Sequence, residues 1–207
     1  GSTASGDGGA ATSSSTSGGG GSGATTQTSG GGGGGAGSST GQGGSPPSGL
    51  SILAWNLEQF PLTAGAPVLI EAVLAELQPD VVGVEEIEDD AAFFAMADTL
   101  PGYKAIIADD PFNYTRVGML YREDAVTVDA VETLFLDDSY AFPRPPLKAH
   151  LTVQATGFDF DFVVIHLKAQ IDAASEARRL AGCNALDSWI QKRLADGLEG
   201  DIVLAGD

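Results

Sequence analysis

An abrupt change of composition near residue 49 constrains this chain more than any other feature. Residues 1–49 hold 20 of the 29 glycines, one charged side chain (Asp7) and no large apolar side chain. A segment built from Gly, Ser, Thr and Ala cannot bury enough apolar surface to offset the entropy of ordering its backbone. We therefore expect residues 1–49 to form a disordered Gly/Ser/Thr-rich linker. Residues 50–207 are enough for one domain with its own core and too few for two.

The acidic charge of the domain limits its partners. All ten Lys and Arg residues and 27 of the 28 Asp and Glu residues lie in 50–207, which gives this part a net charge of −17. This charge argues against electrostatic steering toward nucleic acid, unless a local positive rim opposes it. The candidates for such a rim are Arg116, Arg122, Arg144 and Lys168.

Cysteine content and hydropathy exclude three further classes of protein. Cys183 is the only cysteine, so the chain can form neither an internal disulfide nor a multi-cysteine zinc site. No apolar run reaches the roughly 18–20 residues of a membrane-spanning helix.

Hydrophobic periodicity predicts a layered α/β (α+β) domain with mixed sheets. Helices are expected from Pro67 to Gln78, from Asp89 or Asp90 to Leu100, and over Asp172–Ala195 with Gly197 capping its end. In the first helix, the residues expected to face the core are Val68, Ile70, Val73, Leu74 and Leu77. Strands are expected at Ser51–Trp55, Asp80–Val84, Tyr103–Ala108, Arg116–Arg122, Ala125–Phe135, Lys148–Ala155, Phe158–Ile165 and Asp201–Ala205. Helix-linked strands and hairpin strands both occur in this order, which favours mixed over purely parallel sheets.

Polar side chains follow four of these predicted strands. Asn56 comes after the first strand, Glu85 and Glu86 after the second, His166 after an apolar strand and Asp207 after the last. Polar groups at the tips of buried strands share a rigid rim, where layered α/β folds often build active sites. Carboxylates, an amide and an imidazole at one rim fit a site for a hard cation and a phosphoryl group.

Each of these residues also has an ordinary structural interpretation. Acidic runs such as residues 85–90 are usually solvated partners of a helix N-terminus. A single histidine at a strand end is more often structural, Asn56 is in a position typical of turns, and Asp207 could be a loop acid. The order of these residues and their flanking sequences together favour the site.

Six sequence motifs carry a family resemblance: LAWNLEQF, DVVGVEEIED, RVGMLYR, FPRPP, VVIHLKA and DIVLAGD. In this order and at this spacing, they resemble the endonuclease/exonuclease/phosphatase superfamily, which has a DNase I-like fold. The resemblance covers nearly all of residues 50–207. It implies a four-layer αββα sandwich and a metal-dependent phosphoesterase.

The resemblance also implies roles for individual residues. Asn56 resembles the Asn that helps position metal-bound water and the phosphate, and Glu86 the metal-binding Glu, with Glu85 where the family usually has Gln. Arg144 resembles a phosphate-contacting Arg, and His166 a His that donates to phosphate or acts in acid catalysis. Asp207 resembles the Asp that orients the water and assists at the metal. The implied ion is Mg²⁺, with Mn²⁺ or Ca²⁺ as alternatives.

The family pattern continues where this sequence stops. The family's Asp is followed by Phe-Asn and, further on, by an Asp-His pair whose His is the general base. We therefore expect the domain to be incomplete at its C-terminus and the chain as given to be inactive. Thr115 or Arg116 stands where some nucleases have an acid that pairs with the imidazole, so the partner of His166 is open.

Two functions from different classes follow. The first is a divalent-metal-dependent phosphoester hydrolase, a phosphodiesterase or a nuclease, that uses in-line attack by an activated water. Its substrate would be a nucleic acid, a small molecule or a phospholipid headgroup. The alternative is a catalytically decayed, surface-tethered binding module on the same fold. We expect a bacterial, extracytoplasmic monomer, either secreted or an envelope lipoprotein, because a lipid anchor upstream of Gly1 would fit the long linker.

The linker interpretation predicts that deleting residues 1–49 leaves the melting temperature of the domain unchanged, since a linker contributes no packed surface. Thermal unfolding of the two chains, followed by circular dichroism in the same buffer, measures this. A large drop in melting temperature would show that the segment packs on the domain.

Overall fold

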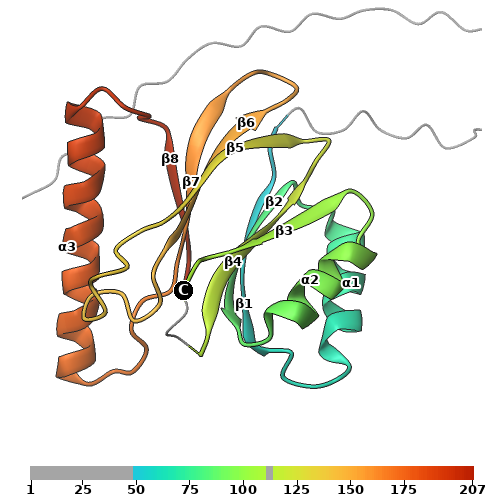
Figure 1. The fold of residues 1–207 in the computed structure, drawn as a ribbon, viewed down its shortest axis with the longest axis horizontal. Helices are drawn as coiled ribbons and strands as arrows, with labels where there is room; N and C mark the ends of the chain where they lie inside the picture. The colour runs from blue at the N-terminus through green and yellow to red at the C-terminus, as the bar shows by residue number, and fades with distance from the viewer. Residues whose placement is uncertain (1–48, 111–113) are drawn as a thin grey trace, which may run out of the picture. The chain divides into compact units, whose positions relative to one another are not determined.

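The computed structural model describes residues 49–110 and 114–207, which form four layers (Figure 1). Two four-stranded sheets lie face to face, with helices α1 and α2 outside the first sheet and α3 outside the second. The strands are β1 (Ile52–Phe60), β2 (Val81–Ile87), β3 (Tyr103–Ile107), β4 (Arg116–Arg122), β5 (Val126–Thr133), β6 (Leu147–Val153), β7 (Asp159–Ile165) and β8 (Ile202–Gly206). The helices are α1 (Ala66–Leu77), α2 (Asp90–Thr99) and α3 (Ala173–Ala195). This arrangement confirms the predicted four-layer αββα class.

The predicted linker, residues 1–49, lies outside the described residues except for Gly49, so the domain boundary stays a prediction. Among the residues that the structure describes, no helix is both long and apolar enough to cross a membrane.

The first sheet has the order β1-β2-β4-β3. β1 and β2 are parallel, and β4 runs antiparallel to both β2 and β3. Val82 and Val84 of β2 pack under α1 and α2, while Val81 packs in the layer between the two sheets. A strand buried on both faces explains the unbroken apolar start of VVGVEEI.

The second sheet has the order β5-β6-β7-β8. The pairs β5–β6 and β6–β7 are antiparallel, and β7–β8 is parallel, with α3 as the crossover between them. Phe160, Phe162 and Val164 of β7 face the first sheet. The alternate residues of β7 face α3, where Ile165 packs beside Phe142 and Leu186.

Glycine allows the two sheets to approach closely at their centre. A Cβ atom added at Gly83 of β2 would lie 3.2 Å from side-chain atoms of both Phe162 and Val164 on β7. This separation is shorter than ordinary van der Waals contact, so a larger residue at position 83 would push the sheets apart.

The structure corrects the predicted ends of the first two strands. β1 continues to Phe60 and β2 to Ile87, so Asn56, Glu85 and Glu86 lie within strands and not after them. The reason is that pairing resumes beyond an irregular stretch. The β1–β2 register shifts between Asn56 and Phe60, and the β2–β4 register shifts between Val84 and Ile87.

The predicted inner face of α1 is wrong at three of its five positions. Ile70 and Leu74 are buried, whereas Val68 is 64% exposed, Leu77 is 60% exposed and Val73 is also exposed. A single i, i+4 pair covers the part of the sheet that α1 reaches, so the rest of its apolar surface faces outward. The other predicted helix and strand bounds hold to within two residues, and Gly197 follows α3 with a positive φ of 67°.

Candidate active site

Strand direction brings the predicted site residues to one edge of the two sheets. Asn56 lies in β1 and Glu86 near the end of the parallel strand β2, while His166 follows β7 and Asp207 follows the parallel strand β8. Parallel neighbours end at the same edge of a sheet. Because the sheets face each other, the two edges together form one site.

The side-chain amide of Asn56 links the two sheets. Its Nδ2 donates to Oε1 of Glu86 at 3.2 Å and to Oδ2 of Asp207 at 3.1 Å. One amide group thus holds two carboxylates that are 121 positions apart along the chain. The Oδ1 of Asn56 accepts from the backbone N–H of Glu58 at 2.9 Å, which fixes the orientation of the amide.

Glu86 is positioned by a local irregularity in both strands. Glu86 has a φ of 62°, and Glu58 and Gln59 on the neighbouring strand have φ values of 51° and 58°. Non-glycine residues in this region are strained by about 1–3 kcal/mol each and concentrate at functional sites. The bulged geometry lets the N–H of Gln59 donate to Oε2 of Glu86 at 3.1 Å, so each carboxylate oxygen has a donor.

His166 and Arg144 form the cationic side of the site. His166 is 4% exposed, and its Nε2 lies 3.7 Å from Oε1 of Glu86. The guanidinium of Arg144 donates to the carbonyl of Leu167 at 2.6 Å, next to His166 in the chain. Among the described residues, the Nε of Arg144 and the Nδ1 of His166 have no hydrogen-bond partner. Both atoms are buried polar atoms whose hydrogen-bonding capacity the described residues leave unused.

The imidazole of His166 is neutral at physiological pH. Burial, followed by the nearby charge of Arg144, lowers its pKa to about 4, although Glu86 and Asp207 act in the opposite direction. A neutral imidazole can donate from one nitrogen and accept at the other. Burial also lowers the pKa of Arg144, while the charges of Glu86 and Asp207 act to raise it.

Sequence reasoning missed the burial of Glu85. This side chain is 1% exposed, and its Oε1 has no hydrogen-bond partner among the described residues. Burial, followed by the charges of Asp207 and Glu86, raises the pKa of Glu85 to about 7. The signal was present in the sequence, because the alternation of VVGVE places Val81, Gly83 and Glu85 on one face of the strand.

A glycine is required just before Asp207. Gly206 has a φ of 138°, and a Cβ there would lie 1.9 Å from the carbonyl oxygen of Ile165 and 3.1 Å from Oε1 of Glu85. No other residue fits this position without moving β8 away from β7. The Gly-Asp sequence therefore sets where the Asp207 carboxylate lies.

The donor set of the site fits a hard divalent cation. Glu86 and Asp207 supply carboxylate oxygens that the Nδ2 of Asn56 bridges, and no sulfur ligand is present among the described residues of the site. Oxygen ligands of this kind suit Mg²⁺, which keeps several of its waters. The structure fixes the positions of these residues, while their roles stay predictions.

The positive rim suggested for the site is not formed. Arg116 pairs with Asp90 at 2.6 Å, and Lys168 donates to the carbonyl of Ala169 at 3.1 Å. Arg122 lies at the other end of the sheet, because β4 runs antiparallel to β2. Of the four basic residues suggested, Arg144 is the one that faces the carboxylates of the site.

The sequence left the partner of His166 open. Arg116 donates to Asp90, and neither Arg116 nor Thr115 is an acid that could accept from the imidazole. The carboxylate that approaches His166 is that of Glu86.

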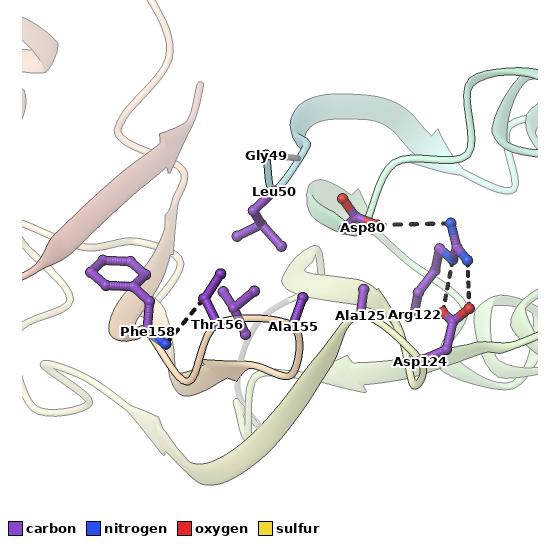
Figure 2. Close-up of a pocket in the computed structure, with 10 residues that line it drawn as sticks. Gly49, Leu50, Asp80, Arg122, Asp124, Ala125, Ala155, Thr156 and Phe158 are labelled. Carbon is purple, nitrogen blue, oxygen red and sulfur yellow. Dashed lines mark hydrogen bonds and ion pairs between the residues drawn. The ribbon is translucent and has the colours of Figure 1, made fainter. Parts of the chain in front are cut away.

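A pocket of about 610 Å³ lies away from these residues, at the end of the sheets where β1 and β2 begin (Figure 2). Its polar groups pair with one another, since Arg122 contacts Asp80 at 3.8 Å and Asp124 at 2.6 Å. The rest of its lining is largely apolar and includes Leu50, Val153 and Phe158. None of the predicted catalytic residues lines it.

Comparisons with known proteins support the fold. No protein-family model and no curated protein matches the sequence. The structure is similar to an endonuclease/exonuclease/phosphatase family protein from Bacteroides thetaiotaomicron, with a TM-score of 0.60, 18% identity, and coverage of 76% of this chain and 61% of that one. It is similar to a mannosyl-6-phosphatase from the same species, with a TM-score of 0.60, 17% identity, and coverage of 77% and 65%. It is also similar to D. rerio TDP2 complexed with a single-stranded DNA product, with a TM-score of 0.58, 22% identity, and coverage of 76% and 60%.

These likenesses confirm the predicted fold, which this chain shares with a solved endonuclease/exonuclease/phosphatase family protein. The chain spans about three-fifths of the length of the solved structures that it matches.

The burial of Glu85 predicts a pH-dependent cost to stability in metal-free protein. The folded-state pKa of about 7 exceeds the ordinary value of 4.5, so the unfolded chain loses its proton first as the pH rises. The contribution of Glu85 to stability therefore falls between pH 4.5 and 7. Glu85→Gln removes this cost, and we expect a gain in unfolding free energy of about 1–3 kcal/mol at pH 8 and little change at pH 4.5.

Urea unfolding in EDTA across this pH range measures the effect. Glu76→Gln, at an exposed position on α1, is the matched control. The difference in unfolding free energy between this variant and the wild type should not change with pH. Equal effects of Glu85→Gln at pH 4.5 and pH 8 would contradict the pKa assignment.

Proposed function

We propose that the polypeptide carrying this domain is a divalent-metal-dependent phosphoester hydrolase that works by in-line attack of a water on phosphorus. The observation that carries the proposal is the link made by Asn56 between Glu86 and Asp207 at distances of 3.2 Å and 3.1 Å. A binding surface needs no such pairing of two carboxylates across two sheets. Phosphoryl transfer does need oxygen ligands for a cation and an acceptor that orients a water.

Asp207 is the group that we assign to the water. It is exposed, it follows a strand tip, and its Oδ2 is held by Asn56, which leaves Oδ1 to accept from a water molecule. The backbone on both sides of the carboxylate is fixed, because the N–H of Leu167 donates to the carbonyl of Asp207 at 3.0 Å and the N–H of Asp207 to that of Ile165 at 3.3 Å. A carboxylate held in this way limits the directions from which its water can approach.

Arg144 and His166 are the groups that we assign to the phosphate oxygens. Arg144 brings a permanent positive charge, and its Nε has no partner among the described residues. His166 is neutral and can donate one hydrogen bond without being charged. Donors that are already in place stabilise the negative charge that builds on the equatorial oxygens in the transition state.

Glu86 and Asp207 would hold the cation, and Mg²⁺ is the ion that their oxygen donors favour. When bound, the ion supplies positive charge against the phosphate and the leaving oxygen. Asn56 bridges the two carboxylates through its Nδ2, which limits how far apart they can move.

The substrate class is narrowed by charge. The solved structures that this chain resembles include a mannosyl-6-phosphatase and a TDP2 with bound single-stranded DNA product. Residues 50–207 carry a net charge of −17, and two of the basic residues suggested for a rim are paired with acids. We therefore favour a small phosphoester or a short single strand over duplex DNA.

Glu86→Gln tests the proposal directly. We expect this variant to lose metal-dependent hydrolysis of bis(p-nitrophenyl) phosphate while keeping its circular dichroism spectrum, because an amide removes the ligand charge and leaves the volume unchanged. The assay uses the polypeptide encoded by the complete reading frame, with Mg²⁺ or Mn²⁺ titrated from zero. Asp98→Asn, at an exposed position on α2, is the matched control and should keep wild-type activity.

Full activity of Glu86→Gln would refute the metal assignment. A wild-type protein that binds the phosphoester in the presence of metal and never turns it over would favour the binding-module alternative.

His166→Ala tests the phosphate contact. We expect turnover to fall by about 10²-fold or more, because a positioned donor or proton-transfer group contributes a factor of this size. Steady-state kinetics should show the loss in kcat, since the contact strengthens as charge develops. A near-normal rate would mean that His166 is structural.

A further inference from the structure

A second group of metal-ligating side chains lies at the opposite end of the second sheet. His150 is in β6, Asp159 begins β7, and Glu199 lies between α3 and β8. One ligand atom from each residue lies within 4.8 Å of the other two. Figure 1 shows the connection from α3 to β8 at one end of β8 and the C-terminus, with Asp207, at the other. This group is therefore separate from the candidate active site.

The imidazole of His150 is held in the orientation that metal-binding histidines adopt. Its Nδ1 lies 3.0 Å from Oδ1 of Asp161, which is fully buried, and its Nε2 lies 3.5 Å from Oδ2 of Asp159. A carboxylate that accepts from one ring nitrogen fixes the tautomer and makes the other nitrogen the ligand. Asp161 is itself fixed, because Arg193 of α3 donates to its second oxygen.

The charges around the group leave two carboxylates uncompensated. The charge of Asp161 is balanced by Arg193 and by Lys148, whose Nζ lies 3.8 Å from Oδ1. Within residues 49–110 and 114–207, neither Asp159 nor Glu199 forms an ion pair with a Lys or an Arg. One oxygen of Glu199 accepts from the backbone N–H of Asp201 at 2.7 Å, which anchors that side chain to the start of β8. Two carboxylates match the charge of one divalent cation, and the imidazole of His150 adds a nitrogen donor.

We propose that His150, Asp159 and Glu199 form a second metal site, which takes a divalent first-row transition ion such as Zn²⁺. One imidazole nitrogen with two carboxylate oxygens is a donor set for Zn²⁺ or its neighbours, while Mg²⁺ and Ca²⁺ prefer oxygen alone. Water would complete the coordination at this partly exposed position.

The bound ion would act as a cross-link. It would tie β6 and β7 to the segment that leads into β8, because each of these three parts of the chain contributes one ligand. The inference does not depend on the proposed hydrolase activity, because none of the three residues belongs to the active site.

Zn²⁺ binding to the whole chain tests the site. Isothermal titration with Zn²⁺ in a large excess of Mg²⁺ should give one equivalent of tight binding, and Co²⁺ should give a visible absorption band from a nitrogen- and oxygen-ligated ion. The double variant Asp159→Asn/Glu199→Gln should weaken Zn²⁺ binding by at least about 10-fold, since two of the three ligands lose their charge. In thermal melts, Zn²⁺ should raise the melting temperature of the wild type and not that of the double variant.

Two matched controls make the test decisive. Asp187→Asn, at an exposed position on α3, should bind Zn²⁺ like the wild type. Glu86→Gln/Asp207→Asn removes the active-site carboxylates and should also leave Zn²⁺ binding intact. The proposal is overturned if the wild type binds no Zn²⁺, or if binding survives in Asp159→Asn/Glu199→Gln. Loss of binding in Glu86→Gln/Asp207→Asn alone would equally overturn it and would place the ion at the active site.

Discussion

The close approach of the two sheets is the constraint on which the candidate site depends. Asn56 and Glu86 belong to the first sheet and Asp207 to the second, yet one amide bonds to both carboxylates. A side chain as short as asparagine can do this only if the sheets are close at their edges. Gly83 allows the two sheets to lie close together at their centre, because a Cβ at this position would be 3.2 Å from both Phe162 and Val164. The packing between the two sheets therefore also sets the geometry of the candidate site.

The same closeness concentrates negative charge. Glu85, Glu86 and Asp207 come from neighbouring strand ends, and the mutual repulsion of these carboxylates contributes to the raised pKa of Glu85. The positive charge of Arg144 compensates part of this negative charge, and a divalent cation would compensate the rest. The protein therefore holds its acids in an arrangement that is unfavourable without a ligand. Sites that bind cations are commonly built in this way, because a preorganised set of ligands need not be assembled on binding.

Local sequence predicted the parts of the fold that depend on local pattern. Runs such as FVVIH and IVLAGD place His166 and Asp207 directly after short apolar strands, and the structure confirms both positions. Asn56 and Glu86 were assigned to strand ends, which is wrong because pairing resumes at Phe60 and Ile87 after a register shift. Such shifts arise from partners far along the chain, so no local pattern reports them. The alternation of VVGVE does indicate the face of β2 on which Glu85 lies, but the burial of Glu85 also requires β7 and β8 to cover that face.

Strand β8 has a role at both of its ends. It is the last strand of its sheet in the described part of the chain, it pairs with β7 along one side, and most of its residues are only partly buried. A strand that pairs on one side only and is partly exposed can shift unless its ends are fixed. Gly206 fixes one end by allowing contact with Ile165, and the Asn56 amide then holds the Asp207 carboxylate. At the other end, Glu199 is anchored to the N–H of Asp201, beside His150 and Asp159. An ion at that end would restrain the strand that carries Asp207 without contacting the reacting groups. In the proposed mechanism, a small displacement of the Asp207 carboxylate would slow phosphoryl transfer, so restraint of β8 would link the stability of the sheet to the geometry of the site.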